Sequence, residues 1–202
     1  MSRPSPPVRR GASVRTLRII GGFWRGRRLR FPPTPEIRPT PDRVRETLFN
    51  WIAARVPDAR CLDLFAGSGA LGLEALSRGA ARVIFVERDP AAAREIAARL
   101  AEWGARAASV EQTDAREFLE RVPAAPFDIV FLDPPFASML LEESAARLEQ
   151  GGWLSSGALM YLECPAAAAP RLPEGWTPVK SKRAGEVGYH LYSRAARGTH
   201  SE

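Results

Sequence analysis

Asp133-Pro134-Pro135-Phe136 is a run of residues whose types suit the binding of a planar amino group. The Asp133 carboxylate and the Pro134 backbone carbonyl can each accept one hydrogen of an NH2 group. Two successive prolines fix φ and supply no N–H donor, so the carbonyl direction is rigid. Phe136 offers a ring on which a nucleobase can stack, worth about 1–3 kcal/mol. The run predicts a clamp for a nucleobase amine; the alternative is a proline loop in which Asp133 caps the next helix.

A second motif, Asp63-Leu-Phe-Ala-Gly-Ser-Gly-Ala-Leu-Gly72, lies about 60 residues before the clamp. Its three glycines match G-x-G-x-x-G, in which a strand leads into a helix and the backbone approaches a nucleotide cofactor. Glu87 follows Gly67 by 20 residues, which is the spacing of an acid that binds ribose hydroxyls. Alone, this pattern is equally typical of an NAD-dependent oxidoreductase.

Two carboxylates favour S-adenosylmethionine over NAD as the cofactor. At Asp63 a negative charge would repel the pyrophosphate of a dinucleotide, but it suits the ammonium group of an amino-acid moiety. Asp114 follows a later predicted strand and offers an acceptor for an adenine amine. Hydride transfer has no evident use for the Asp133 clamp. Together, the two motifs predict a methyl donor held beside a nucleobase amine.

Short apolar runs alternate with helical patterns from residue 40 onward, which predicts a mostly parallel sheet with helices on both faces. The expected parallel strands are 61–65, 83–87, 108–112, 127–132 and 159–163. Two closely spaced runs, 177–182 and 187–192, predict an antiparallel pair. Ligands of such sheets bind beyond the carboxyl ends of the strands. Asp63, Glu87, Asp114 and Asp133 should therefore line one rim.

Helix boundaries follow from capping residues. Thr40 with Pro41, and Asp89 with Pro90, each combine an N-cap side chain with a proline at the first helical position. Asp114 is a third predicted cap. The expected helices begin at 40, 69, 90, 115 and 138.

Positive charge is concentrated at the N-terminal end. Residues 1–45 hold twelve arginines against Glu36 and Asp42, a local charge of +10, which leaves −4 for the other 157 residues of a chain with net charge +6. This asymmetry predicts a surface that faces a phosphate backbone, and the alternative is a solubilising tail. Residues 18–31 read as two short strands joined near Gly26, a basic β-hairpin. The candidate RNA contacts on it are Trp24, Arg25, Arg27, Arg28 and Arg30.

Composition excludes several other classes. The 202 residues are 45% apolar, and no apolar run approaches the roughly 20 residues that span a membrane. Cys61 and Cys164 lie in apolar runs, as reduced core thiols do, and two scattered histidines give no metal-ligand spacing. No secretory signal is visible, so the cytoplasm is the expected location. Residues 1–17 are rich in Pro, Ser and Arg and are expected to be disordered.

The two motifs resemble those of class I S-adenosylmethionine-dependent methyltransferases, in the branch whose (D/N/S)PP(Y/F/W) run acts on exocyclic amines. Three further stretches narrow the resemblance: Arg18–Leu29, Arg38–Trp51 and Gly188–Tyr192. The set is similar to the RsmD family, bacterial enzymes that methylate guanine N2 in small-subunit (16S) ribosomal RNA. The resemblance covers about residues 18–193.

This resemblance implies a Rossmann-like, seven-stranded sheet with the last strand antiparallel, in a methyltransferase domain over 40–193 that follows the hairpin and connector of 18–39. Residues 194–202 would form a tail. The implied donor contacts are Asp63, Phe65, Gly67 and Gly69 at the methionine end, Glu87 at the ribose, and Asp114 with Ala115 at the adenine. Asp133, Pro134, Pro135 and Phe136 would hold the guanine amine. Arg38, Thr40 and Arg43 would close over the donor or bind RNA phosphate.

The leading prediction is a monomeric guanine-N2 methyltransferase that acts on ribosomal RNA, free or in the assembling small subunit. Adenine N6 in DNA is the first alternative, because the clamp accepts either amine. A protein that binds RNA without chemistry is the second, and the NAD-dependent oxidoreductase is the third.

Overall fold

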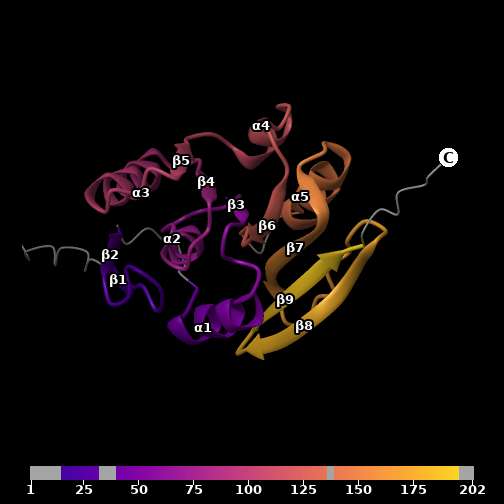
Figure 1. The fold of residues 1–202 in the computed structure, drawn as a ribbon. Coiled ribbons are helices and arrows are strands. Elements are labelled where there is room, and N and C mark those ends of the chain that lie inside the picture. The colour runs from indigo at the N-terminus through magenta and orange to yellow at the C-terminus, as the bar shows by residue number, and fades with distance from the viewer. Residues whose placement is uncertain (1–14, 32–39, 136–138, 196–202) are drawn as a thin grey trace, which may run out of the picture.

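The computed structural model describes residues 15–31, 40–135 and 139–195, and shows a two-stranded hairpin beside a seven-stranded sheet (Figure 1). The hairpin strands are β1 (Arg15–Arg18) and β2 (Arg28–Phe31). The sheet strands are β3 (Arg60–Asp63), β4 (Arg82–Val86), β5 (Ala108–Glu111), β6 (Phe127–Leu132), β7 (Leu154–Pro165), β8 (Trp176–Ala184) and β9 (Val187–Arg194). The helices are α1 (Asp42–Trp51), α2 (Ala70–Ser77), α3 (Pro90–Glu102), α4 (Ala115–Leu119) and α5 (Leu140–Gln150).

The sheet has the predicted topology. Its strand order is β5-β4-β3-β6-β7-β9-β8, and the five strands from β5 to β7 pair in parallel. β9, the last strand of the chain, lies antiparallel between β7 and β8. The carboxyl ends of β3 to β7 therefore meet at one rim.

Alternation along the strands divides the core into two layers. Cys61 and Phe131 belong to a buried cluster with apolar side chains of α1, α2 and α3. Their neighbours Leu62 and Leu132 point the other way and pack with α4 and α5. Figure 1 shows α4 and α5 on one side of the sheet and α1 and α2 on the other. Both faces are covered, which is why the strand sequences are almost continuously apolar.

Two predicted boundaries need correction. β7 begins at Leu154, five residues before the predicted start, because Gly157 at φ +70° and a register shift against β6 let polar, exposed residues continue the strand. Thr40 is not the N-cap of α1: the cap residue is Pro41, and the Thr40 hydroxyl donates instead to Glu163 Oε1 at 3.0 Å. Competition from this buried carboxylate overrides the local capping preference.

Other caps are confirmed. Asp89 Oδ1 accepts from the backbone N–H groups of Ala91 and Ala92 at 2.9 and 2.7 Å. Asp114 Oδ1 accepts from the Arg116 N–H at 2.8 Å. Both helices begin where the sequence places them.

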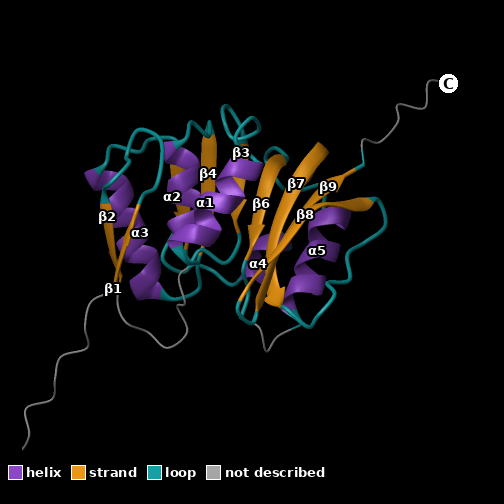
Figure 2. Ribbon diagram, turned by 90° about the horizontal axis from the view of Figure 1, so that it is seen from below, coloured by secondary structure: helices purple, strands orange, loops and turns teal. Residues whose placement is uncertain are grey.

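The hairpin is antiparallel, as predicted, but it starts earlier. β1 begins at Arg15, so the prediction of disorder for residues 1–17 is wrong for residues 15–17. The segment between the strands is longer than a tight turn and folds onto α2. Residues 1–14 and 196–202 lie outside the described residues. Figures 1 and 2 place the hairpin on the side of the molecule opposite β8 and β9.

A buried ion-pair network fixes the hairpin to the sheet domain. Glu74 of α2 is fully buried and accepts from the backbone N–H groups of Ile20 and Gly21, both at 2.8 Å. It also accepts from Arg78 Nε at 2.8 Å and lies 3.5 Å from Nη1 of the fully buried Arg45. A single carboxylate thus accepts hydrogen bonds from the hairpin and α2 and forms an ion pair with Arg45 of α1.

A close backbone contact completes this junction. Gly22 has φ +77°, and a Cβ there would lie 1.7 Å from the Ser77 carbonyl oxygen, so only glycine fits. The same carbonyl accepts from the Phe23 N–H at 2.7 Å. The Ser77 hydroxyl donates to the Gly21 carbonyl at 2.6 Å and accepts from the Trp24 N–H at 2.9 Å. The segment after β1 is therefore held rigidly on α2.

Among the described helices, none is both long and apolar enough to cross a membrane. In the same residues, no group of three or more His, Cys, Asp or Glu side chains is placed to hold a metal ion.

Glu74→Ala should destabilise the protein strongly, because it removes the buried charge that lies 3.5 Å from Arg45 and leaves two backbone donors without their acceptor. We expect the free energy of unfolding to fall by about 3–5 kcal/mol. Urea unfolding followed by circular dichroism measures this. The control is Glu46→Ala on the exposed face of α1, which should change the stability by less than about 0.5 kcal/mol. Equal losses in both variants would contradict the role of Glu74.

Candidate active site

Carboxylates gather at the rim formed by the strand ends, as predicted. Asp63 ends β3, Glu87 follows β4, Asp133 follows β6, and Asp114 follows β5. The sequence analysis did not select a fifth carboxylate, Glu163, which lies near the end of β7. Its signal was present, because the predicted strand 159–163 ended on it.

Asp63 is a buried carboxyl group, and within the described residues no cationic side chain forms an ion pair with it. Its side chain is 3% exposed, and Oδ2 accepts from the Gly72 N–H at 2.9 Å. Burial, together with the nearby charge of Glu87, raises the pKa of Asp63 to about 7. A positively charged ligand group at this point would stabilise the carboxylate and lower that pKa.

The glycine loop beside Asp63 has a backbone conformation that depends on glycine. Gly67 and Gly69 have φ values of +52° and +75°, which glycine adopts without strain. The Gly67 N–H donates to Glu87 Oε2 at 2.6 Å, and the Asp89 N–H donates to Oε1 at 2.7 Å. Glu87 therefore shapes the loop, and each of its oxygens keeps a second lone pair for a ribose hydroxyl.

The predicted adenine contacts lie farther along the rim. Asp114 is half-buried and uses one oxygen as the cap of α4, and the neighbouring Ala115 is buried. Phe65, which was predicted at the methionine end, follows β3, is half-buried and packs against the α4–α5 layer. These positions agree with the order methionine, ribose, adenine, while the individual roles stay predictions.

These residues fit S-adenosylmethionine. The buried Asp63 carboxylate suits a cationic amino-acid portion, the glycine loop permits close approach, and Glu87 keeps acceptor capacity for ribose hydroxyls. A dinucleotide fits poorly, since its pyrophosphate would meet the Asp63 charge at the first turn.

The clamp lies beside this loop. Asp133 is half-buried, Pro134 is buried and Pro135 is exposed, whereas Phe136 lies outside the described residues. Burial, and then the charges of Glu163 and Asp63, raise the pKa of Asp133. The alternative interpretation of Asp133 as a helix cap is wrong, because α5 begins only at Leu140 and Met139 holds its N-cap position.

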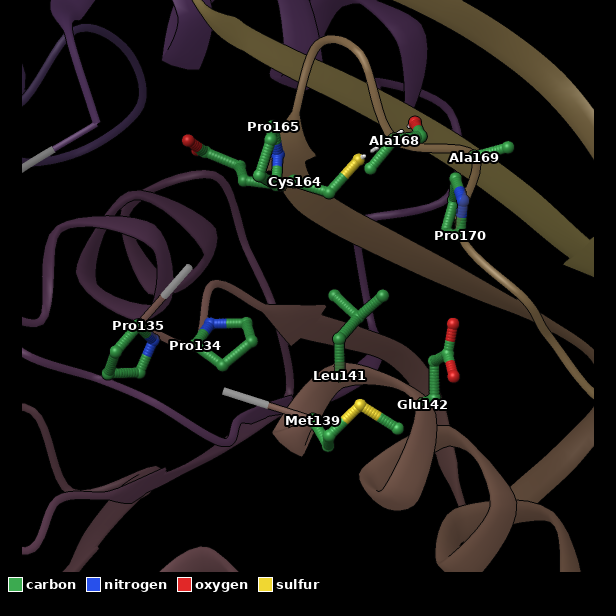
Figure 3. Close-up of a pocket in the computed structure, with 11 residues that line it drawn as sticks. Pro134, Pro135, Met139, Leu141, Glu142, Cys164, Pro165, Ala168, Ala169 and Pro170 are labelled. Carbon is green, nitrogen blue, oxygen red and sulfur yellow. Dashed lines mark hydrogen bonds between the residues drawn. The ribbon is translucent and has the colours of Figure 1, made fainter. Parts of the chain in front are cut away.

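A cavity of about 180 Å³ lies next to the double proline. Figure 3 shows Pro134 and Leu141 on one side of it and Cys164 on the other. Two carboxylates, Glu142 and Glu163, also line it. An apolar slot with acceptors at its border suits a flat ring that carries N–H donors.

Glu163 is held by two hydroxyl groups. Tyr161 Oη donates to Oε1 at 2.7 Å and Thr40 Oγ1 donates to the same oxygen at 3.0 Å. The Thr40 hydroxyl also acts to lower the pKa of Asp133, so Thr40 lies beside both carboxyl groups. Burial raises the pKa of Glu163 above its usual range, and burial with the Glu163 charge raises the pKa of Tyr161.

The basic hairpin carries a second aromatic residue, Phe23, beside the predicted Trp24. Trp24 packs against Trp103 of α3 with ring centroids 5.0 Å apart, and the Arg27 guanidinium lies 5.4 Å from the Trp103 ring. Phe23 is 91% exposed. Sequence reasoning missed Phe23 because its exposure depends on a tertiary contact: the segment is hydrogen-bonded to Ser77 of α2.

The arginine set is only partly described. Arg25, Arg27 and Arg28 are exposed on the hairpin, and Arg43 is exposed on α1. The backbone of Arg30 lies in β2, but its side chain lies outside the described residues, as does the whole of Arg38.

Comparisons with known proteins agree with this geometry. The family described as conserved hypothetical protein 95 matches residues 17–193. Ribosomal RNA small subunit methyltransferase D of Escherichia coli (strain K12) is 50% identical over 183 residues, which cover 90% of this chain and 92% of the relative. The structure of the Escherichia coli methyltransferase YhhF, also 50% identical, superposes with a TM-score of 0.82 and covers 90% of this chain and 99% of that chain.

A more distant structure shares the fold. It is an RNA methyltransferase from Salinibacter ruber in complex with S-adenosyl-L-homocysteine, 18% identical with a TM-score of 0.60, and the match covers 81% of this chain and 98% of that one. The predicted class I fold and the predicted S-adenosylmethionine-dependent methyltransferase activity are confirmed, and the NAD-dependent alternative is excluded. The chain belongs to the family of ribosomal RNA small subunit methyltransferase D.

Proposed function

We propose that this protein transfers a methyl group from S-adenosylmethionine to the exocyclic N2 amine of a guanine in small-subunit (16S) ribosomal RNA. One observation carries the proposal: the buried Asp63 carboxylate, which a cation would stabilise, lies at the same rim as the Asp133-Pro134 amine clamp, on the neighbouring strand. The name of the Escherichia coli relative, which specifies small-subunit ribosomal RNA, supports the choice of substrate.

On the donor side, the chain supplies charge and shape. The bound donor would present an activated methyl group on a positively charged sulfur. Asp63 stabilises the cationic end of the molecule, and Glu87 fixes the loop through the Gly67 N–H. Burial makes these electrostatic contacts stronger than they would be in water.

On the acceptor side, Asp133 and the Pro134 carbonyl hold the two hydrogens of the amine. This grip turns the nitrogen lone pair toward the methyl group and draws the nitrogen out of conjugation with the ring. Positioning and charge stabilisation account for the rate, and no strong base is required. Because its pKa is raised, the Asp133 carboxylate can also take up the proton that the methylated nitrogen releases.

The cavity beside Pro134 would receive the guanine. A base reaches such a slot only after it leaves its stack, so the target is a guanine in a loop or one that is flipped out. The hairpin would hold the surrounding RNA: Arg25 and Arg28 contact phosphates, and Phe23 stacks on an unpaired base. We infer that the protein acts as a monomer, in the cytoplasm, on ribosomal RNA or the assembling small subunit.

The product of the reaction tests this function. Unmodified ribosomal RNA is incubated with labelled S-adenosylmethionine and digested, and we expect the label in N2-methylguanosine. Label in N6-methyladenosine, with DNA as the better substrate, would support the adenine alternative instead. RNA binding without any transfer would support a binding protein.

Asp133→Ala should lower transfer by about 100–1,000-fold, because the amine loses one of its two acceptors. Donor affinity should stay within about threefold, since Asp133 faces the amine. Asp133→Asn is the matched control: it keeps an acceptor oxygen and should retain far more activity. Rapid-quench assays give the rates, and calorimetry gives the donor affinity. Full activity of Asp133→Ala would contradict the clamp.

Asp63→Asn should separate stability from donor binding. Its amide oxygen can still accept from Gly72, but the buried charge is gone. The folded-state pKa of Asp63 is raised to about 7, so the stability of the wild type falls as the pH rises from about 4 to above 7. The stability of the variant should fall less over the same pH range. At pH 8 we expect the variant to unfold about 2–4 °C higher.

Thermal unfolding with and without donor gives the second readout. Saturating S-adenosylmethionine should raise the midpoint of the wild type and leave that of Asp63→Asn nearly unchanged. Near pH 4 the two free proteins should unfold at similar temperatures, which is the internal control. A variant that is less stable at pH 8, or one that still responds fully to the donor, argues against the assignment.

The hairpin prediction separates charge from stacking. Replacing Arg25 and Arg28 with Ala should lower the slope of log affinity against log salt by about 1–2. Phe23→Ala should weaken RNA binding by about 5–150-fold without changing that slope. Replacing Lys180 and Lys182 with Ala, on β8 at the far edge, removes the same charge and should leave the slope unchanged. Equal slopes for both double variants would reject the hairpin as the RNA surface.

A further inference from the structure

Glu163 lies next to the amine clamp by strand register. β6 and β7 pair in parallel, with Leu132 opposite Leu162. Asp133 and Glu163 are the next residues after this pair, at the rim of the sheet. Alternation directs both side chains toward the layer of α1 to α3, where the Thr40 hydroxyl donates to Glu163 and lies beside Asp133. Two carboxyl groups thus share one end of the proposed amine site.

One oxygen of Glu163 is available to a ligand. Oε1 takes the hydroxyl hydrogens of Tyr161 and Thr40, and in the described part of the chain no hydrogen bond reaches Oε2. Glu163 is 5% exposed and is one of the residues that border the cavity, with Pro134. An acceptor oxygen beside the clamp that is not used by the protein can take a donor from a ligand.

Guanine supplies such a donor beside its amine. Its N1 carries a hydrogen, next to the two hydrogens of N2, so its edge presents a row of donors. In adenine the ring nitrogen beside the N6 amine is an acceptor, whose lone pair would face the carboxylate. A carboxylate adjacent to the clamp therefore matches guanine and opposes adenine.

Building on the proposed function, we propose that Glu163 selects guanine by accepting the N1–H hydrogen while Asp133 and Pro134 hold the N2 amine. The hydroxyl groups of Tyr161 and Thr40 hold the carboxylate in place and favour its charged form. The alternative is that Glu163 only anchors the segment before α1 through Thr40. In that role, replacement of Glu163 would slow methyl transfer equally whichever base stands at the target position.

The test uses synthetic RNA fragments that span the methylated guanine, once nucleoside analysis has located it. One fragment keeps guanine, and the other carries 2-aminopurine, which has the same 2-amine but a lone pair in place of the N1 hydrogen. For the wild type we expect kcat/KM to be about 10–100-fold lower on 2-aminopurine. For Glu163→Gln, we expect kcat/KM on the guanine fragment to fall by about 10–100-fold. Its kcat/KM values on the two fragments should then agree within about threefold, because the amide can donate a hydrogen to N1 of 2-aminopurine.

Tyr161→Phe is the matched control. It loosens the same hydrogen-bond group without altering the carboxylate, so it should slow both substrates alike and keep the preference. Equal slowing of both substrates by Glu163→Gln would overturn the proposal. If that variant does not fold, wild-type kinetics alone decide, since a wild type indifferent to 2-aminopurine overturns it too. Failure of the proposed function looks different: the wild type then methylates no guanine at all.

Discussion

Burial of several carboxylates at one rim is the constraint on which the site depends. Asp63, Asp133 and Glu163 lie at or near the ends of neighbouring parallel strands, and burial raises the pKa of each, with like charges adding to the shift at Asp63 and Asp133. Such a cluster weakens the fold unless ligands supply cations and N–H donors. A sulfonium donor with its ammonium group, and an amine-bearing base, supply both. The free protein is thus less stable because of the same carboxyl groups that bind the two substrates.

The rest of the fold fixes the position of this cluster relative to the hairpin, the proposed RNA surface. Glu87 shapes the donor loop, and Thr40 ties the start of α1 to the end of β7. Glu74 joins the hairpin to α1 and α2 through buried ion pairs. Because these contacts involve buried groups, the exposed Phe23 and the hairpin arginines keep a fixed position relative to the clamp. Recognition and chemistry are therefore coupled through α2.

Sequence reasoning predicted what depends on local pattern and missed what depends on tertiary partners. Alternating apolar runs and the two motifs were sufficient for the sheet, the rim and the positions of Asp63, Glu87 and Asp133. Thr40 was assigned to a cap because its distant acceptor, Glu163, is invisible in the local sequence. Glu74 was not selected because it stands in an otherwise apolar helix. Trp24 was selected and Phe23 was not, because the contacts with Trp103 and Ser77, which decide which ring faces solvent, are tertiary.

The most direct test of the central claim is a crystal structure of the protein with S-adenosylhomocysteine. The account predicts that the amino-acid portion lies beside Asp63, with the ribose hydroxyls on Glu87 and the sulfur facing the carbonyl of Pro134. It also predicts an open path from that sulfur to the cavity bordered by Glu163. A cofactor bound away from the rim, or a double-proline turn directed away from the sulfur, would contradict the account.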